Sequence, residues 1–316
     1  MTRETRVFES SASIENKPIA HECPIETFGM RPTTASSLLK NSSIELSTNG
    51  EDAIRGAAEI LPTGMAVYVP KMPRATLSDK LVQLRLLRKY GFNPIPHVVA
   101  RQLSSENELR AFLADATDSA GVHRVLVIGG DGKEAAGPFD DSAALIATGI
   151  LREFGLSAVD VAGYPDGHPV ISSATLADDL QRKVDIAGEQ GLDLGIVTQF
   201  SFDPGSVVRF CREISEVAPG VPVYAGLAGP TSPGKLLRFA KLCGVSTSMR
   251  AANKLGINAV KLAMNSGPDK QFDVLAGGKA RREAGNLAGI HLFSFGGFVD
   301  SAQWLDDKAR SAGLGS

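Results

Sequence analysis

The chain has few cysteines, which disulfide-rich extracellular proteins and cysteine metal sites need, and no basic cluster of the kind that binds nucleic acid. Only three of its 316 residues are cysteines, Cys23, Cys211 and Cys243. Their odd number and wide spacing argue against a disulfide framework and against a CxxC metal site. Basic and acidic residues nearly balance, 33 against 35, and no basic cluster occurs. Nucleic acid is therefore not expected as a partner, because phosphate binding requires clustered Lys and Arg.

Long apolar segments are also missing. No run of about 18 apolar residues occurs, and the first residues lack the apolar core of a secretory signal. We therefore expect no membrane segment and a cytoplasmic location. The hydrophobic and charged fractions, 43% and 22%, are those of a globular protein with a large core.

The sequence does contain a repeated alternation of short apolar runs and helix-like stretches. Each run is rich in β-branched residues, and each except the last precedes a helix-like stretch of about 10–20 residues. Parallel strands need such crossover helices, so the pattern predicts an α/β fold, a (β/α)8 TIM barrel over residues 41–316. Residues 1–40 are predicted to form an N-terminal extension with a short helix near its end. The eight runs are 42–47, 65–70, 95–100, 124–131, 159–169, 194–200, 221–227 and 290–297.

Polar residues follow most of these runs, and the reacting groups of such barrels lie at the carboxyl ends of the strands. We expect the closed barrel to bring them together, although no spacing typical of metal ligands occurs among them. The spacing of Gly130, Gly132 and Ala135 resembles the glycine-rich motif of dinucleotide-binding sites. Asp131 would place a negative charge beside the pyrophosphate, so we do not expect such a site. The residues at the strand ends are Glu45, His97, Gly130, Asp131, Tyr164, His168 and Gln199.

Several of these residues lie in longer motifs that match one family. Through them the chain resembles the methylenetetrahydrofolate reductase family, in its single-domain bacterial form, over residues 40 to 298. The specific signal is AGYPDGHP at 162–169 together with TQFSFD at 198–203, in this order and on these strands. The motifs are SIEL at 43–46, PH at 96–97, GD at 130–131, AGYPDGHP at 162–169, RKVD at 182–185 and TQFSFD at 198–203.

The resemblance implies reduction of 5,10-methylenetetrahydrofolate to 5-methyltetrahydrofolate, with FAD as the usual hydride carrier and NADH or NADPH as the reductant. The methylene bridge opens to an iminium cation when its leaving nitrogen is protonated. Glu45 lies between the apolar residues Ile44 and Leu46, which favours a raised pKa and a role as general acid. Asp131 would stabilise the iminium cation and bind the pterin amino group.

The resemblance also assigns binding roles. Gln199 would bind the pterin, since a side-chain amide offers both a donor and an acceptor, and Phe200 would contribute a stacking surface. Residues that would surround the flavin ring or meet its phosphates are His97, Gly130, Asp131, Tyr164, His168, Arg182 and Lys183.

Three departures from the family pattern fall on flavin contacts. The family's arginine before Gly-Asp is Gly129 here, its tyrosine before the next helix is Asp140, and its aspartate before RKVD is Leu176. They motivate the hypothesis that the protein binds flavin weakly or takes hydride directly from NADH.

Three other functions remain open. Lys261 could act as the Schiff-base lysine of a class I aldolase barrel, although it lies in a helix-like stretch. A folate-dependent methyl-transfer barrel would share the pterin contacts but would not need Glu45 as an acid. A non-catalytic folate- or flavin-binding subunit would fit the lost flavin contacts, and a homo-oligomer is compatible with the sequence.

Overall fold

The chain divides into two compact units, residues 1–31 and 32–316. In the computed structural model only the second unit contains described residues, so the predicted extension lies outside them up to residue 33. Its expected short helix is present as α1 (Thr34–Lys40), which packs against β8, α12 and α13 of the barrel. The structure describes residues 34–47, 50–71, 75–131, 134–232, 235 and 268–314.

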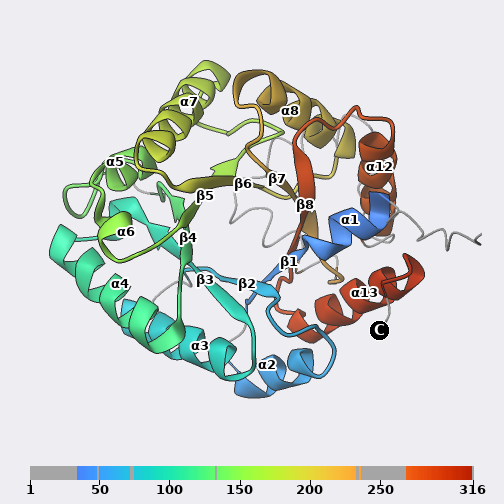
Figure 1. Ribbon diagram of the computed structural model, residues 1–316, viewed down its shortest axis with the longest axis horizontal. Helices are drawn as coiled ribbons and strands as arrows, with labels where there is room; N and C mark the ends of the chain where they lie inside the picture. Colours follow the sequence, from blue (N-terminus) through green and yellow to red (C-terminus); the bar gives the residue numbers. More distant parts are fainter. Residues whose placement is uncertain are drawn as a thin grey trace, which may run out of the picture. The chain divides into compact units, whose positions relative to one another are not determined.

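Eight parallel strands close into a barrel in sequence order, with β1 paired to both β2 and β8. The predicted TIM barrel is therefore confirmed, and helices surround the ring of strands (Figure 1). All eight apolar runs of the sequence contain or overlap a strand. The strands are β1 (Ser43–Glu45), β2 (Ala66–Val69), β3 (Asn93–Val99), β4 (Arg124–Ile128), β5 (Ala158–Gly163), β6 (Asp193–Thr198), β7 (Val223–Ala228) and β8 (Leu287–Phe293).

The described helices mostly follow the predicted stretches. The stretch expected at 141–154 is two helices, because Gly149 takes a positive φ of 76° between them. The sequence also predicts a helix at 232–242 and two helices between 246 and 284. Residues 233–234 and 236–267, including Lys261, lie outside the described residues, and one described helix, at Asp269–Ala280, falls in the second span. The helices are α2 (Glu51–Ala58), α3 (Leu77–Lys89), η1 (Ala100–Gln102), α4 (Glu106–Ala120), α5 (Ser142–Ala147), α6 (Ile150–Glu153), α7 (Ser173–Glu189), α8 (Pro204–Val217), α12 (Asp269–Ala280) and α13 (Phe298–Ser311).

The expectation that no helix follows the last strand is wrong. Helix α13 begins at Phe298, directly after β8, and packs against α2 and β1. Its buried face consists of Phe298, Ser301, Ala302 and Leu305, a helical spacing. Two of these four residues are small, which makes the apolar stripe inconspicuous in the sequence.

Two separate apolar regions support the barrel. The larger lies between the strands and the helices, and the smaller lies inside the barrel around Tyr68, Ile95, Leu126 and Val197. Because side chains alternate along a strand, every second residue points inward. The interior also holds polar groups, so it offers chemistry as well as packing.

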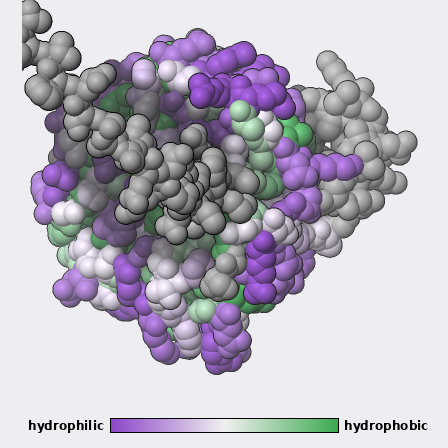
Figure 2. Space-filling model, turned by 45° about the vertical axis from the view of Figure 1, so that its right-hand side comes forward, coloured by the Kyte–Doolittle hydropathy of each residue, from purple (hydrophilic) through white to green (hydrophobic). Residues whose placement is uncertain are grey.

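The outer surface of the described helices is mainly polar. Figure 2 shows mostly hydrophilic side chains on the face that it presents, with hydrophobic residues in smaller separate patches. Among the described helices, none is long and apolar enough to cross a membrane. Cys211 is buried on α8, and burial raises the pKa of its thiol to about 12, so it packs as an inert side chain.

Candidate active site

Glu45 is the last residue of β1, with Tyr68 of β2 and Phe293 of β8 as its register partners. It therefore lies at the carboxyl end of the barrel, where the sequence places it. Only 12% of its side chain is exposed, and burial raises its pKa to about 8. At neutral pH the carboxyl group is consequently protonated and able to donate a proton.

His97 of β3 faces this carboxyl group. Its Nε2 lies 3.8 Å from Glu45 Oε2, too far for a hydrogen bond, and has no hydrogen-bond partner within the described residues. Burial lowers the pKa of His97 well below its usual range, and the nearby Lys80 and His291 lower it further. The pair is therefore a neutral acid beside a neutral imidazole.

Lys80 on α3 holds this part of β3 from outside the barrel. Its ammonium group donates to the backbone carbonyl of His97, and the residue is 2% exposed. Burial, followed by the charge of Lys71, lowers the pKa of Lys80 to about 7. Lys80 could not be predicted from the sequence as a site residue, because it lies on the apolar face of a helix and belongs to no motif.

The ends of β1 and β8 are joined by serine hydroxyls. Ser294 Oγ donates to the backbone oxygen of Glu45 at 2.6 Å and lies 2.6 Å from Ser47 Oγ. Ser47 Oγ also accepts from the backbone N–H of Gly296 at 2.6 Å. These bonds fix the backbone on which the Glu45 carboxyl depends.

The loops of the AGYPDGHP and TQFSFD motifs are joined to each other. Ser206 Oγ, in the first turn of α8, donates to Asp166 Oδ1 at 2.6 Å. Asp203 caps α8 by accepting from the Gly205 N–H at 2.9 Å, and Pro204 follows at the first helical position, where its missing N–H costs nothing. The two motifs therefore form one rim above β5 and β6.

His168 is held by its own loop. The backbone N–H groups of Val170 and Ile171 donate to its Nδ1 at 3.3 and 3.2 Å. The ring proton of the neutral form therefore resides on Nε2, which leaves a donor for a ligand. The ring lies edge-on to Tyr164 at 5.2 Å between centroids.

Asp131 lies near enough to Tyr164 to affect it electrostatically. Burial raises the pKa of the Tyr164 hydroxyl, and the charges of Asp131 and Asp179 raise it further. The barrel therefore brings together the strand-end residues of β4 and β5, Asp131 and Tyr164, as the sequence predicts. Gly130 precedes Asp131 with a φ of 96°, and an added Cβ would lie 2.4 Å from Val99. Only glycine fits there, because the Val99 side chain occupies the space that a Cβ would need.

Gln199 follows β6 at the same end of the barrel as Glu45, and its backbone N–H donates to Gly163 at 2.8 Å. Its Oε1 accepts from the Phe200 N–H at 3.2 Å. Phe200 is only 1% exposed and lies edge-on to Phe202, Phe293 and Phe295. Its ring thus supports the wall beside Gln199 and offers little surface to a substrate.

Arg182 and Lys183 lie on α7 and already have carboxylate partners. Arg182 pairs with Asp141 at 2.5 Å and with Asp179 at 3.3 Å. The Lys183 ammonium group pairs with Asp179, and its side chain is 9% exposed. A phosphate at these two residues would compete with Asp179.

Polar residues deeper in the barrel were not found from the sequence. Asp160 of β5 is fully buried and accepts from Tyr68 and from Arg124, each at 2.7 Å. His291 of β8 is also fully buried, and its Nδ1 lies 2.9 Å from Ser43 Oγ. Asp160 lies inside an otherwise apolar run, and that interruption is the one signal that could have identified it. Among the described residues, no three His, Cys, Asp or Glu side chains gather to hold a metal ion.

Comparison with known proteins gives the family. The model of the family described as methylenetetrahydrofolate reductase matches residues 52–260, which are 209 of the 316 residues. The chain belongs to the methylenetetrahydrofolate reductase family. The matched span begins after β1, so the assignment of Glu45 depends on the SIEL motif and on the geometry described above.

Individual enzymes with this name share less than a third of their residues with the chain over the aligned segment. The chain is 29% identical to 5,10-methylenetetrahydrofolate reductase of Pectobacterium carotovorum subsp. carotovorum over 157 residues, which are 49% of this chain and 50% of that protein. The enzyme of the same name from Salmonella typhimurium is 28% identical over the same shares. The chain thus matches about half the length of these curated relatives.

A solved structure supports the fold. An uncharacterized protein from Clostridium thermocellum, described as binding two copies of 5-methyl-5,6,7,8-tetrahydrofolic acid, superposes with a TM-score of 0.52. The alignment covers 85% of this chain and 95% of that chain, at 11% sequence identity. At this identity the likeness is one of fold.

Proposed function

We propose that this member of the methylenetetrahydrofolate reductase family reduces 5,10-methylenetetrahydrofolate to 5-methyltetrahydrofolate, or catalyses the reverse reaction, in the cytoplasm. The hydride comes from NADH or NADPH, with FAD as its carrier. The observation that carries this proposal is the buried carboxyl of Glu45 at the barrel rim, whose pKa of about 8 keeps it protonated at neutral pH. A reductase of this class needs such an acid before hydride transfer can begin.

The proposed chemistry starts with proton transfer. Glu45 donates its proton to N10 of the folate, the N10–methylene bond breaks, and a cationic iminium forms at N5. Asp131 stabilises this cation and binds the pterin amino group, while Gln199 holds another edge of the pterin. Addition of hydride to the methylene carbon then gives the methyl product and leaves Glu45 ionised. Phe200 serves this site by supporting the wall on which Gln199 lies.

A flavin, when bound, supplies the hydride that the nicotinamide delivers. We assign its ring to His97, Gly130, Asp131, Tyr164 and His168. His168 accepts at Nδ1 from its own loop, and the donor that it keeps at Nε2 suits a planar heterocycle with polar edges. Arg182 and Lys183 would meet the phosphates, in competition with Asp179.

Anaerobic mixing of the protein with NADH and methylenetetrahydrofolate, with and without added FAD, tests the proposal. We expect NADH oxidation coupled one-to-one to formation of 5-methyltetrahydrofolate. A requirement for added FAD would indicate weak flavin binding, and reaction in flavin-free protein would indicate direct hydride transfer. Absence of reaction under both conditions would contradict the proposal and favour a non-catalytic folate-binding subunit.

A further inference from the structure

One feature that the proposed reaction does not use is a cavity at the opposite end of the barrel. Its volume is about 850 Å³, within the usual range for small-molecule sites. It is lined by residues at the beginnings of strands, including Ser43, Ala66 and Arg124, whereas Glu45 and Gln199 lie at strand ends. The cavity is therefore separate from the candidate active site.

Polar side chains line one end of this cavity, among them Arg124, Tyr68 and Tyr224. Asp160, fully buried and not itself part of the lining, accepts from Arg124 Nη1 and from the Tyr68 hydroxyl. The first of these bonds holds the guanidinium group of Arg124, whose side chain is 25% exposed. Within the described residues its remaining nitrogens and the Tyr224 hydroxyl make no hydrogen bond. The lining thus presents oriented donors that lack acceptors.

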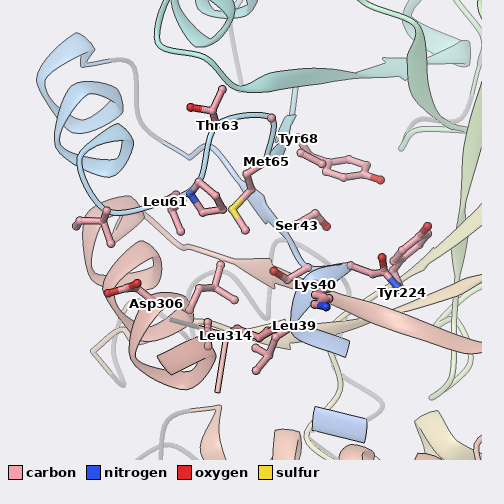
Figure 3. Close-up of a pocket in the computed structure, with 18 of the residues that line it drawn as sticks. Leu39, Lys40, Ser43, Leu61, Thr63, Met65, Tyr68, Tyr224, Asp306 and Leu314 are labelled. Atoms are coloured by element: carbon pink, nitrogen blue, oxygen red, sulfur yellow. The ribbon is translucent and has the colours of Figure 1, made fainter. Parts of the chain in front are cut away.

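The other end of the cavity is apolar. Figure 3 shows Leu61 and Leu314 on the side opposite to Tyr68 and Tyr224, with Met65 between them. Leu39 and Leu305 extend this apolar wall. A ligand that satisfies both ends has one polar group and one apolar body.

The charged residues that line the cavity indicate which charge the polar group of a ligand should carry. Three basic residues, Lys40, Arg124 and Arg310, and one acidic residue, Asp306, line the cavity. Asp306 pairs with Arg310 at 2.9 Å, and Asp160 compensates Arg124 from behind. The remaining excess of about one positive charge suits a monoanion better than a dianionic phosphate.

We propose that this cavity binds a small monocarboxylate with an aliphatic or aromatic body. Its carboxylate accepts hydrogen bonds from the free nitrogens of Arg124 and from the Tyr224 hydroxyl, in the geometry that a guanidinium group offers to carboxylates. Its apolar part lies against Leu61 and Met65. Binding at this cavity does not depend on the proposed folate reaction, so either proposal can fail without affecting the other.

Isothermal titration calorimetry with hexanoate tests this site, with hexanol and inorganic phosphate as comparison ligands. We expect hexanoate to bind at least about tenfold more tightly than either, since a charge-assisted hydrogen bond contributes more than a neutral one. Equal binding of hexanoate and hexanol, or no hexanoate binding, would overturn the proposal.

Variants locate the binding. Met65→Trp fills the apolar end and should abolish hexanoate binding, whereas Val82→Trp, at a position that is 54% exposed on α3, should not change it. Tyr224→Phe keeps the ring and should weaken binding several-fold. Hexanoate binding that is unchanged in folded Met65→Trp and Tyr224→Phe would contradict the assignment of the cavity.

Discussion

Glu45 Oε2 and His97 Nε2 lie 3.8 Å apart, and burial makes both groups neutral, raising the pKa of the acid and lowering that of the imidazole. A carboxylate paired with an imidazolium would have given up the proton that the proposed reaction needs. Because burial raises the pKa of Glu45 and lowers that of His97, the proton stays on Glu45. His97 thus acts on the acid by occupying the space beside it without accepting its proton.

This arrangement predicts a specific pH dependence of folding stability. The carboxyl of Glu45 has a pKa of about 8 in the folded protein and an ordinary value of 4.5 when unfolded. Between these values the folded state binds more protons than the unfolded state, so this group's contribution to stability is lost as pH rises from 4.5 to 8. The slope approaches about 1.4 kcal/mol per pH unit.

Urea unfolding at several pH values measures this slope. Glu45→Gln should flatten it, whereas Glu59→Gln, at an exposed position on the surface, should leave it unchanged. A wild-type curve that matches that of Glu45→Gln over the whole range would show that Glu45 ionises normally.

His291 should give a slope of the opposite sign. Burial lowers its pKa to about 3, against an ordinary value of 6.5. The unfolded chain therefore binds the extra proton as pH falls from 6.5 towards 3, and stability decreases over that window. His291→Gln should reduce the acid loss of stability measured by circular dichroism, while His123→Gln on the surface should not. Equal acid sensitivity of both variants would refute the prediction.

The pair of Arg124 and Asp160 should behave as a unit. Arg124→Met leaves the fully buried Asp160 carboxylate with only the Tyr68 hydroxyl, and we expect a loss of about 3–5 kcal/mol in unfolding free energy. Arg124→Met/Asp160→Leu removes both charges and should recover most of that loss. Thermal and denaturant unfolding measure both variants. Additive losses in the double variant would show that the two residues do not depend on each other.

Gln199 should affect folate binding more than the chemical step. Gln199→Leu removes the amide donor and acceptor, and we expect an increase in KM for methylenetetrahydrofolate of about tenfold or more. The exposed Gln303→Leu on α13 is the matched control. An unchanged KM together with a much lower kcat would instead place Gln199 at the reacting atoms.

Flavin binding should depend on which carboxylates pair with the basic residues of α7. Asp179 pairs with both Arg182 and Lys183. Asp179→Asn should free Lys183, leave Arg182 paired with Asp141 alone, and tighten FAD binding several-fold. Lys183→Met should weaken it by about tenfold, as expected for a lost charge-assisted bond. Quenching of flavin fluorescence gives both affinities, with Asp185→Asn on the same helix as control. If neither Asp179→Asn nor Lys183→Met changes the affinity, the phosphates do not bind here.

The barrel could be predicted because its evidence is local. Eight β-branched runs separated by helix-like stretches require a parallel sheet, and their polar ends mark the rim where Glu45, Asp131 and Tyr164 lie. Lys80 and the Arg124–Asp160 pair could not be predicted, because their partners come from other elements and depend on the closure and register of the barrel. Helix α13 was missed because its buried face includes small residues, and the broken helix at 141–154 because Gly149 needs a positive φ.

The pH profile of single-turnover reduction tests the role of Glu45 most directly. The protein, reduced anaerobically by NADH, is mixed with methylenetetrahydrofolate between pH 6 and pH 10, and the rate of 5-methyltetrahydrofolate formation is recorded. We predict a constant rate that falls above a pKa of about 8, and a loss of about 100-fold or more in Glu45→Gln with folate binding retained. A Glu45→Gln variant that keeps both the wild-type rate and the falling limb would contradict the role of Glu45 as the acid.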